Sequence, residues 1–177
     1  MNPAGAARTR RPVALVALVL AAALLGGCYV SGDLLLDPSA AVHPLADGIY
    51  GRQGDPGDRF KLSLEPDGWY AVERVDPSGV LGQTERVLVN PSGDGFALAD
   101  ETPDGFRYAF ARVAGQRLYL AAPDCADPLD RDDAEDQDAL SDDDAPGACR
   151  FKSRAALSAA LTAFAAHADF GAPFVRL

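Results

Sequence analysis

Short segments of alternating apolar and polar residues, each bounded by a turn sequence, fill the chain from residue 47 to 124. One of them places Phe106, Tyr108 and Phe110 on the same side of an extended strand. Between two others, the Glu-Pro-Asp-Gly sequence at 65–68 is typical of a β-turn. The segments lie at 47–51, 59–64, 69–75, 85–90, 95–101, 106–113 and 116–122. We therefore expect about seven short strands joined by hairpins, as an antiparallel meander or a small barrel.

The end of the chain, residues 150–177, has a different periodicity. Leu157, Leu161, Phe164 and Ala168 recur at helical intervals, and Ser153 stands where a helix N-cap is expected, while Gly171 and Pro173 end the pattern. These residues predict one amphipathic helix whose apolar side packs on the open face or the end of the sheet. The predicted fold class is mainly β (α+β), within a single domain.

The N-terminus has the charge and hydropathy pattern of an export signal. Arg8, Arg10 and Arg11 precede an apolar run of 13 residues, 13–25. As a helix this run spans roughly 20 Å, which is shorter than the hydrocarbon core of a bilayer at about 30 Å. It is therefore typical of a signal peptide rather than of a membrane-spanning helix.

The next residues carry a family resemblance. Leu25, Gly26, Gly27 and Cys28 match, position by position, the lipobox of the bacterial lipoproteins. The resemblance implies that residues 1–27 are a signal peptide, that the sulfur of Cys28 is joined to a diacylglyceryl group, and that the new amine of Cys28 is acylated. It covers only the first 28 residues and leaves the fold open.

The same resemblance implies a location. In the family, an aspartate after the lipidated cysteine retains the protein at the inner membrane, and here Tyr29 stands at that position. In a Gram-negative host this favours an outer-membrane anchor with the protein facing the periplasm. Two or three acyl chains hold a protein on a membrane durably. Residues 28–46, with Pro38 and Pro44, are then expected to form a tether, in which the Leu-Leu-Leu of 34–36 docks on the domain or on the membrane.

The other two cysteines, Cys125 and Cys149, would be exported to an oxidising compartment. Two thiols normally close to a disulfide there, and we expect this pairing. Free thiols and a zinc site are the alternatives. A zinc site lacks ligands, because the only histidines are His43 and His167 and no second cysteine lies close by.

The segment between these cysteines, 125–149, is strongly acidic. It holds ten of the chain's 26 acidic residues and one base, Arg131. An EF-type calcium loop started at Asp130 would place Ala134 and Glu135 where an oxygen ligand and a glycine are needed. We expect a solvated, disulfide-closed loop, with weak divalent-ion binding as an alternative. No metal site and no cofactor are predicted.

Residue patterns that would indicate catalysis or nucleic-acid binding are absent from the sequence. It contains neither G-x-S-x-G nor H-E-x-x-H, and no basic patch that could neutralise phosphates. The carboxylates of Asp94, Asp100, Glu101 and Asp104 gather near hairpin ends, where aspartate commonly bonds backbone amides. The sequence therefore predicts a protein that is not an enzyme and does not bind nucleic acid.

Together these features predict an envelope lipoprotein whose small β domain binds a protein partner or a small apolar ligand. The aromatic residues Trp69, Tyr70 and Tyr119 are the candidate binding residues, because aromatic side chains contribute large contact areas. A carboxylate-based envelope enzyme and an acidic-loop ion binder are the alternatives from other functional classes.

Overall fold

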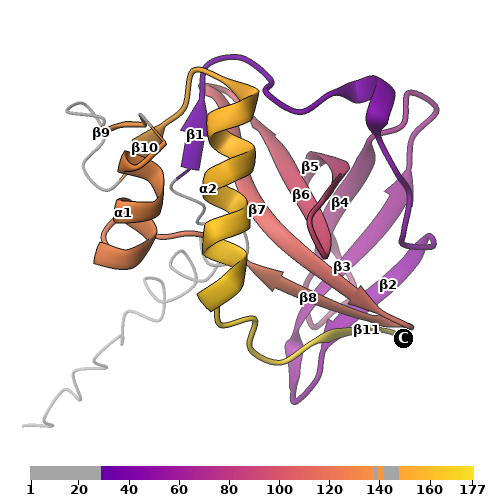
Figure 1. Cartoon of the computed structure of the whole chain (residues 1–177). Helices are drawn as coiled ribbons and strands as arrows, with labels where there is room; N and C mark the ends of the chain where they lie inside the picture. The colour runs from indigo at the N-terminus through magenta and orange to yellow at the C-terminus, as the bar shows by residue number, and fades with distance from the viewer. Residues whose placement is uncertain (1–28, 138, 142–147) are drawn as a thin grey trace, which may run out of the picture.

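The computed structural model describes residues 29–137, 139–141 and 148–177, which form a β-barrel with two helices against its outer side (Figure 1). The expected signal peptide and the lipobox cysteine, Cys28, lie outside the described residues. Every described strand and helix begins at or after Tyr29. Among the described residues, no helix has the length and apolar character needed to cross a bilayer.

Eight strands form the barrel, and each is antiparallel to both of its neighbours. In order around the barrel they are β2 (Gly48–Arg52), β3 (Asp55–Leu64), β4 (Tyr70–Val75), β5 (Leu81–Ser92), β6 (Gly95–Thr102), β7 (Gly105–Ala114), β8 (Arg117–Ala121) and β11 (Phe174–Arg176). The predicted mainly β, antiparallel fold is confirmed, and the sheet closes. Its hairpins follow the predicted turns, and Gly68, with φ of 87°, occupies the left-handed position at the end of the β3–β4 turn.

The closing strand, β11, comes from the last residues of the chain. Val175 pairs with Gly51 of β2 on one side and with Arg117 of β8 on the other. Phe174 is fully buried inside the barrel, with its ring centroid 5.1 Å from that of Phe60. The sequence analysis predicts no strand here, because three residues are too short to show an alternating pattern.

The predicted C-terminal helix is α2 (Arg154–His167). The Ser153 hydroxyl oxygen accepts a hydrogen bond from the Ala156 amide at 3.2 Å and so caps the helix, as expected. Leu157, Leu161 and Phe164 are buried in a layer between the helix and the outer side of the barrel, where α2 lies across β7 (Figure 1).

Strand β7 is buried on both faces. Phe106, Tyr108 and Phe110 share a face, as predicted, and this face points outward into the layer covered by α2. Ala109 and Ala111 point into the barrel instead. The aromatic side chains of the strand therefore support the helix, and its alanines at 109 and 111 face the interior.

The expected tether is wrong for residues 29–46, which belong to the fold. β1 (Tyr29–Ser31) pairs with β7 in antiparallel register and with β10 (Cys149–Arg150) in parallel register. Tyr29 is fully buried, and the Leu-Leu-Leu of 34–36 packs into the outer layer of the domain. Gly105, with φ of 130°, lies so close to β1 that a Cβ there would collide with the Ser31 carbonyl oxygen. A short 3-10 helix, η2 (Pro38–Ala40), follows.

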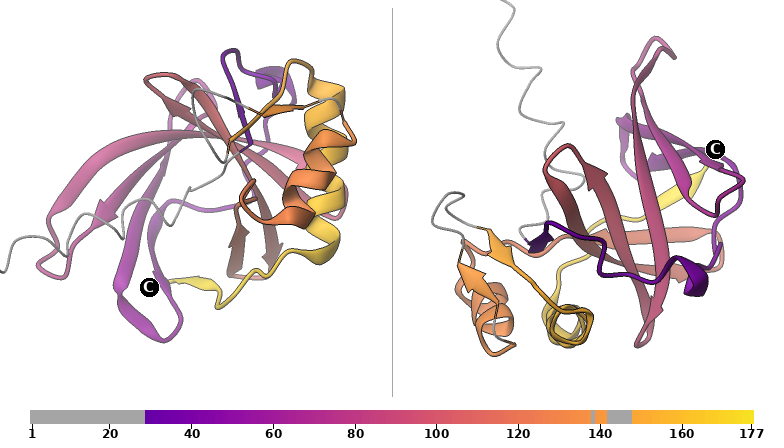
Figure 2. Two further views of the ribbon diagram at one scale, coloured as in Figure 1. Left: turned by 90° about the vertical axis from the view of Figure 1, so that its left-hand side faces the viewer. Right: turned by 90° about the horizontal axis from the view of Figure 1, so that it is seen from above.

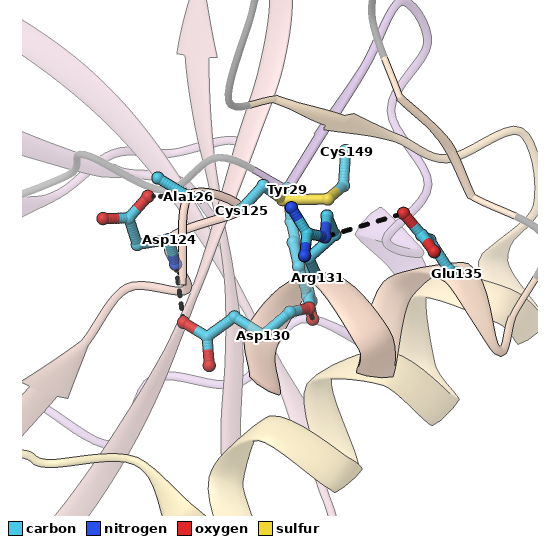
Figure 3. Close-up of a disulfide and its surroundings, with 8 residues drawn as sticks. All are labelled: Tyr29, Asp124, Cys125, Ala126, Asp130, Arg131, Glu135 and Cys149. Carbon is cyan, nitrogen blue, oxygen red and sulfur yellow. Dashed lines mark hydrogen bonds and ion pairs between the residues drawn. A yellow bond between two sulfur atoms is a disulfide. The ribbon is translucent and has the colours of Figure 1, made fainter. Parts of the chain in front are cut away.

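The expected solvated loop is wrong for residues 128–135, which form the helix α1 (Pro128–Glu135). The Asp127 carboxylate caps this helix by accepting from the Leu129 amide at 2.9 Å. Asp130 is buried, and its carboxylate accepts from the Asp124 amide at 2.7 Å, while its carbonyl accepts from the Tyr29 hydroxyl at 2.6 Å (Figure 3). The acidic segment therefore includes an ordered, capped element. Residues 138 and 142–147 of this segment lie outside the described residues.

Helix α1 lies beside α2 on the outside of the barrel, as both views of Figure 2 show. The Nε2 atom of His167, at the end of α2, is 2.8 Å from a carboxylate oxygen of Asp133. A two-residue strand, β9 (Leu140–Ser141), pairs with β10.

The structure contains the expected disulfide between Cys125 and Cys149 (Figure 3). Their Cα atoms are 6.0 Å apart, and both residues are buried in the outer layer. The bond joins the segment after β8 to β10, four residues before α2 begins.

We expect the Cys125→Ala/Cys149→Ala variant to lose roughly 3 kcal/mol of unfolding free energy, because the native bond restricts a loop of about 25 residues in the unfolded chain. Urea denaturation of residues 29–177, oxidised and reduced, measures this loss. Reductant should lower the midpoint of the native protein and leave that of the variant unchanged. Equal midpoints for native and variant would show that the bond does not stabilise the fold.

Candidate functional site

A cavity of about 100 Å³ lies inside the barrel. Its walls are mostly apolar side chains that point inward from β3 to β8, among them Leu62, Val72, Val87, Leu98 and Ala111. An eight-stranded barrel is just wide enough either to be filled by side chains or to hold one small ligand. Engineered apolar cavities of about 150 Å³ bind benzene, so this cavity is of a size to receive one small apolar group.

Residues 42–46 border the cavity at one end. Pro44 and Leu45 line it, and the Tyr70 hydroxyl donates to the Leu45 carbonyl at 2.8 Å. The Tyr50 hydroxyl donates to the Ala46 carbonyl, also at 2.8 Å. These two bonds fix the segment to inward-facing tyrosines of β4 and β2, and they lie where the sequence analysis expected a tether.

The other end of the cavity is charged. Along β4 the inward row runs from Tyr70 through Val72 to Arg74, which is roughly 13 Å from Tyr70 along the strand. On β5, Gln83 and Glu85 continue the inward row of Val87 and Val89 and also line the cavity.

Asp100 and Arg107 continue the inward rows of β6 and β7 at this end, because they follow the alternation of Leu98 and Ala109. They are direct cross-strand partners, and Oδ2 of Asp100 accepts from Nε of Arg107 at 3.0 Å and from Nη2 at 2.5 Å. We refer to Arg74, Glu85, Asp100 and Arg107 as the acid–arginine cluster.

Asp100 is the most buried member of the cluster, with 1% of its surface exposed. Its second carboxylate oxygen, Oδ1, is buried and has no hydrogen-bond partner among the described residues. Burial raises the pKa of the Asp100 carboxyl above its usual range, although Arg107 acts in the opposite direction. The structure therefore holds an incompletely satisfied carboxylate in its interior.

Glu85 lines the cavity, whereas Asp100 and Arg107 do not. Burial, and next the charge of Asp100, raise the pKa of the Glu85 carboxyl, while Arg107 and Arg74 oppose the shift. The Glu85 side chain makes no hydrogen bond or ion pair to any residue that the structure describes. The cavity thus has apolar walls and, at one end, the polar side chains of Arg74, Gln83 and Glu85.

This arrangement suits binding of a ligand with an apolar body and a polar head, because a small number of polar groups is enough to orient a ligand in an apolar pocket. Carboxyls with raised pKa values also occur where enzymes move protons. Within residues 29–137, 139–141 and 148–177 there is no group of three or more His, Cys, Asp or Glu side chains that could hold a metal ion.

The three aromatic residues predicted to bind lie in different places. Tyr70 is buried and lines the cavity. Trp69 is buried in the outer layer, with the Arg86 guanidinium 4.9 Å from its ring centroid. Tyr119 is half-buried on β8, opposite Arg112. The structure does not bring them together into one surface.

The carboxylates near hairpin ends differ in role. Asp94 and Glu101 form ion pairs at the surface, with Arg112 at 3.1 Å and with Arg86 at 3.0 Å. Asp100 is the exception, because it belongs to the buried cluster. Sequence reasoning missed Glu85 and Arg107, although a charged residue that continues an inward row of apolar residues is a signal that alternation alone can supply.

Comparisons with known proteins add no family to this description. No protein-family model, no curated protein and no solved structure matches the chain. The assignment of the site therefore depends on its geometry.

The pH dependence of stability tests the environment of Glu85. Because its pKa is raised in the folded state, the folded protein binds this proton more tightly than the unfolded chain, and the unfolding free energy falls as pH rises from about 4.5 through the folded pKa. The substitution Glu85→Gln removes this pH-dependent fall in the unfolding free energy. We expect the variant to be more stable than the native protein at pH 8, with a smaller difference at pH 5.

Urea denaturation at the two pH values measures this effect. Glu73→Gln is the matched control. Glu73 precedes Arg74 on β4 and lies on the outer face, where its carboxylate is 2.9 Å from Nζ of Lys61. If the unfolding free energies of Glu85→Gln and the native protein change equally with pH, burial does not raise the pKa of the Glu85 carboxyl.

Proposed function

We propose that the protein is a lipid-anchored envelope protein that binds a small, largely apolar molecule inside its barrel. The observation that carries this proposal is the cavity of about 100 Å³ with mostly apolar walls. A ligand that moved its apolar surface from water into this cavity would gain roughly 25 cal/mol for each Å² removed from water.

The interior position of the cavity favours a small molecule over a protein partner. Its walls are inward-facing side chains of the strands, and residues 42–46 are bonded across one end. A protein partner would instead need an exposed surface. If no ligand were found, binding of a protein partner would be the remaining alternative.

The proposed anchor is supported by the arginines at 8–11, the apolar run at 13–25 and the lipobox that ends in Cys28. The disulfide agrees with export, because such bonds persist in oxidising compartments. On this proposal the protein faces the periplasm from the outer membrane, and its function is binding rather than catalysis.

Filling the cavity should abolish ligand retention. Ala111 points into the barrel from β7 and lines the cavity, so the added carbons of Ala111→Leu would occupy it. Native mass spectrometry of oxidised residues 29–177, purified without organic solvent, should show a retained small molecule on the native protein and bare mass for the variant.

Ala114→Leu is the control for this experiment, because Ala114 is exposed at the end of the same strand. It should retain the ligand as the native protein does. Bare mass for all three proteins, together with no rise in melting temperature when hexan-1-ol is added, would contradict ligand binding and leave the protein-partner alternative.

Cys28→Ser should abolish membrane attachment if the lipobox is used. We expect the native chain, expressed with its leader in a Gram-negative host, to partition into the detergent phase with a mass increased by acyl chains, since each buried methylene contributes about 0.8 kcal/mol. The variant should lack this added mass. Asn2→Ala, outside the lipobox, should behave as the native chain does, and a native protein without acyl mass would refute the anchor.

A further inference from the structure

Two carboxylates at the charged end of the barrel have oxygens without a hydrogen bond to a described residue. Oδ1 of Asp100 is buried without such a partner, since both arginine contacts of this carboxylate are made to Oδ2, but Asp100 does not line the cavity. The half-buried Glu85 carboxylate does line the cavity and has no hydrogen bond to a described residue. Glu85 is therefore the carboxylate that a donor on a ligand in the cavity would meet.

The arginines of the cluster already have partners. Arg107 directs Nε and Nη2 to Asp100, and Arg74 has an interaction of its own. A ligand carboxylate would also be repelled by the charge of Glu85, which lines the cavity. A head group that donates hydrogen bonds would find the Glu85 oxygens without displacing either arginine from its partner.

Apolar walls begin directly beside these acceptors. Val87 is the cross-strand partner of Asp100 and lies two residues beyond Glu85 on β5. The inward row then continues to Val89, roughly 13 Å from Glu85 along the strand. A molecule whose polar head meets Glu85 would therefore lay its apolar part along Val87 and Val89.

We propose that the barrel selects amphiphiles with a protonated amine head, which Glu85 binds while the apolar part fills the cavity. This inference rests on the proposed binding function and assigns the chemical class of the ligand. An ammonium group supplies up to three donors and a positive charge, which the Glu85 carboxylate favours over a hydroxyl. Burial raises the pKa of the Glu85 carboxyl, and a bound cation would stabilise its ionised form.

Three six-carbon probes with one apolar part and different heads test this selection: hexylamine, hexan-1-ol and hexanoate. Amide chemical-shift titrations of oxidised, isotope-labelled residues 29–177 at pH 7 give a dissociation constant for each. We expect hexylamine to bind about tenfold or more tightly than hexanoate, with shifts at Val87 and Leu98. Glu85→Gln should reduce the hexylamine affinity about tenfold and leave hexan-1-ol within about twofold.

Glu73→Gln is the matched control, because it removes a carboxylate on the outer face at the same end of the barrel. It should leave all three affinities unchanged. The proposed head group would be overturned if hexylamine bound no more tightly than hexanoate, or if Glu85→Gln did not lower the hexylamine affinity. In either case, binding of hexan-1-ol would still support the cavity as a binding site. Failure of all three probes to bind the folded native protein would overturn the proposed function itself.

Discussion

Backbone hydrogen bonding at the edges of β2 and β8 is the constraint on which the rest of the structure depends. Without β11, each of these strands would present unpaired amides and carbonyls to solvent. Three residues at the end of the chain satisfy both edges, and Phe174 extends into the interior at the same point. Because β11 follows α2, closure also holds the helix against the outer side of β7. The enclosed interior, with its apolar rows and the Asp100–Arg107 pair, exists only once this strand is in place.

Much of the barrel could be predicted because its strands repeat a local pattern. The period-two segments between 47 and 122 became β2 to β8, and the helical spacing after Ser153 became α2. Two of the missed elements, β1 and β11, are three residues each and depend on distant partners. The helix α1 was missed because its sequence is acidic, although Asp127 and Pro128 are ordinary signals for a helix start. The burial of Asp130 involves Tyr29, 101 residues away in the sequence, which no local pattern can indicate.

The candidate site was predictable only in part, because alternation shows which residues share a face but not which face is inside. The row of Phe106, Tyr108 and Phe110 has the character of a core, yet it points outward under α2. The row of Ala109 and Ala111 points inward, and its small side chains contribute to the space left open in the barrel. On β7, the aromatic residues were therefore the wrong guide to the inward face. The charged residues that continue inward rows mark the polar end of the cavity.

The burial of Tyr29 has a mechanical consequence for the proposed anchor at Cys28. Lipoproteins with long linkers can search the space above a membrane, but here the first residue after the anchor is locked into β1 between β7 and β10. The acyl chains and the barrel would move as one rigid body, with a fixed side toward the lipid and no reach beyond the diameter of the domain. Molecules that meet this protein would then have to arrive at the membrane surface, where encounters occur in two dimensions.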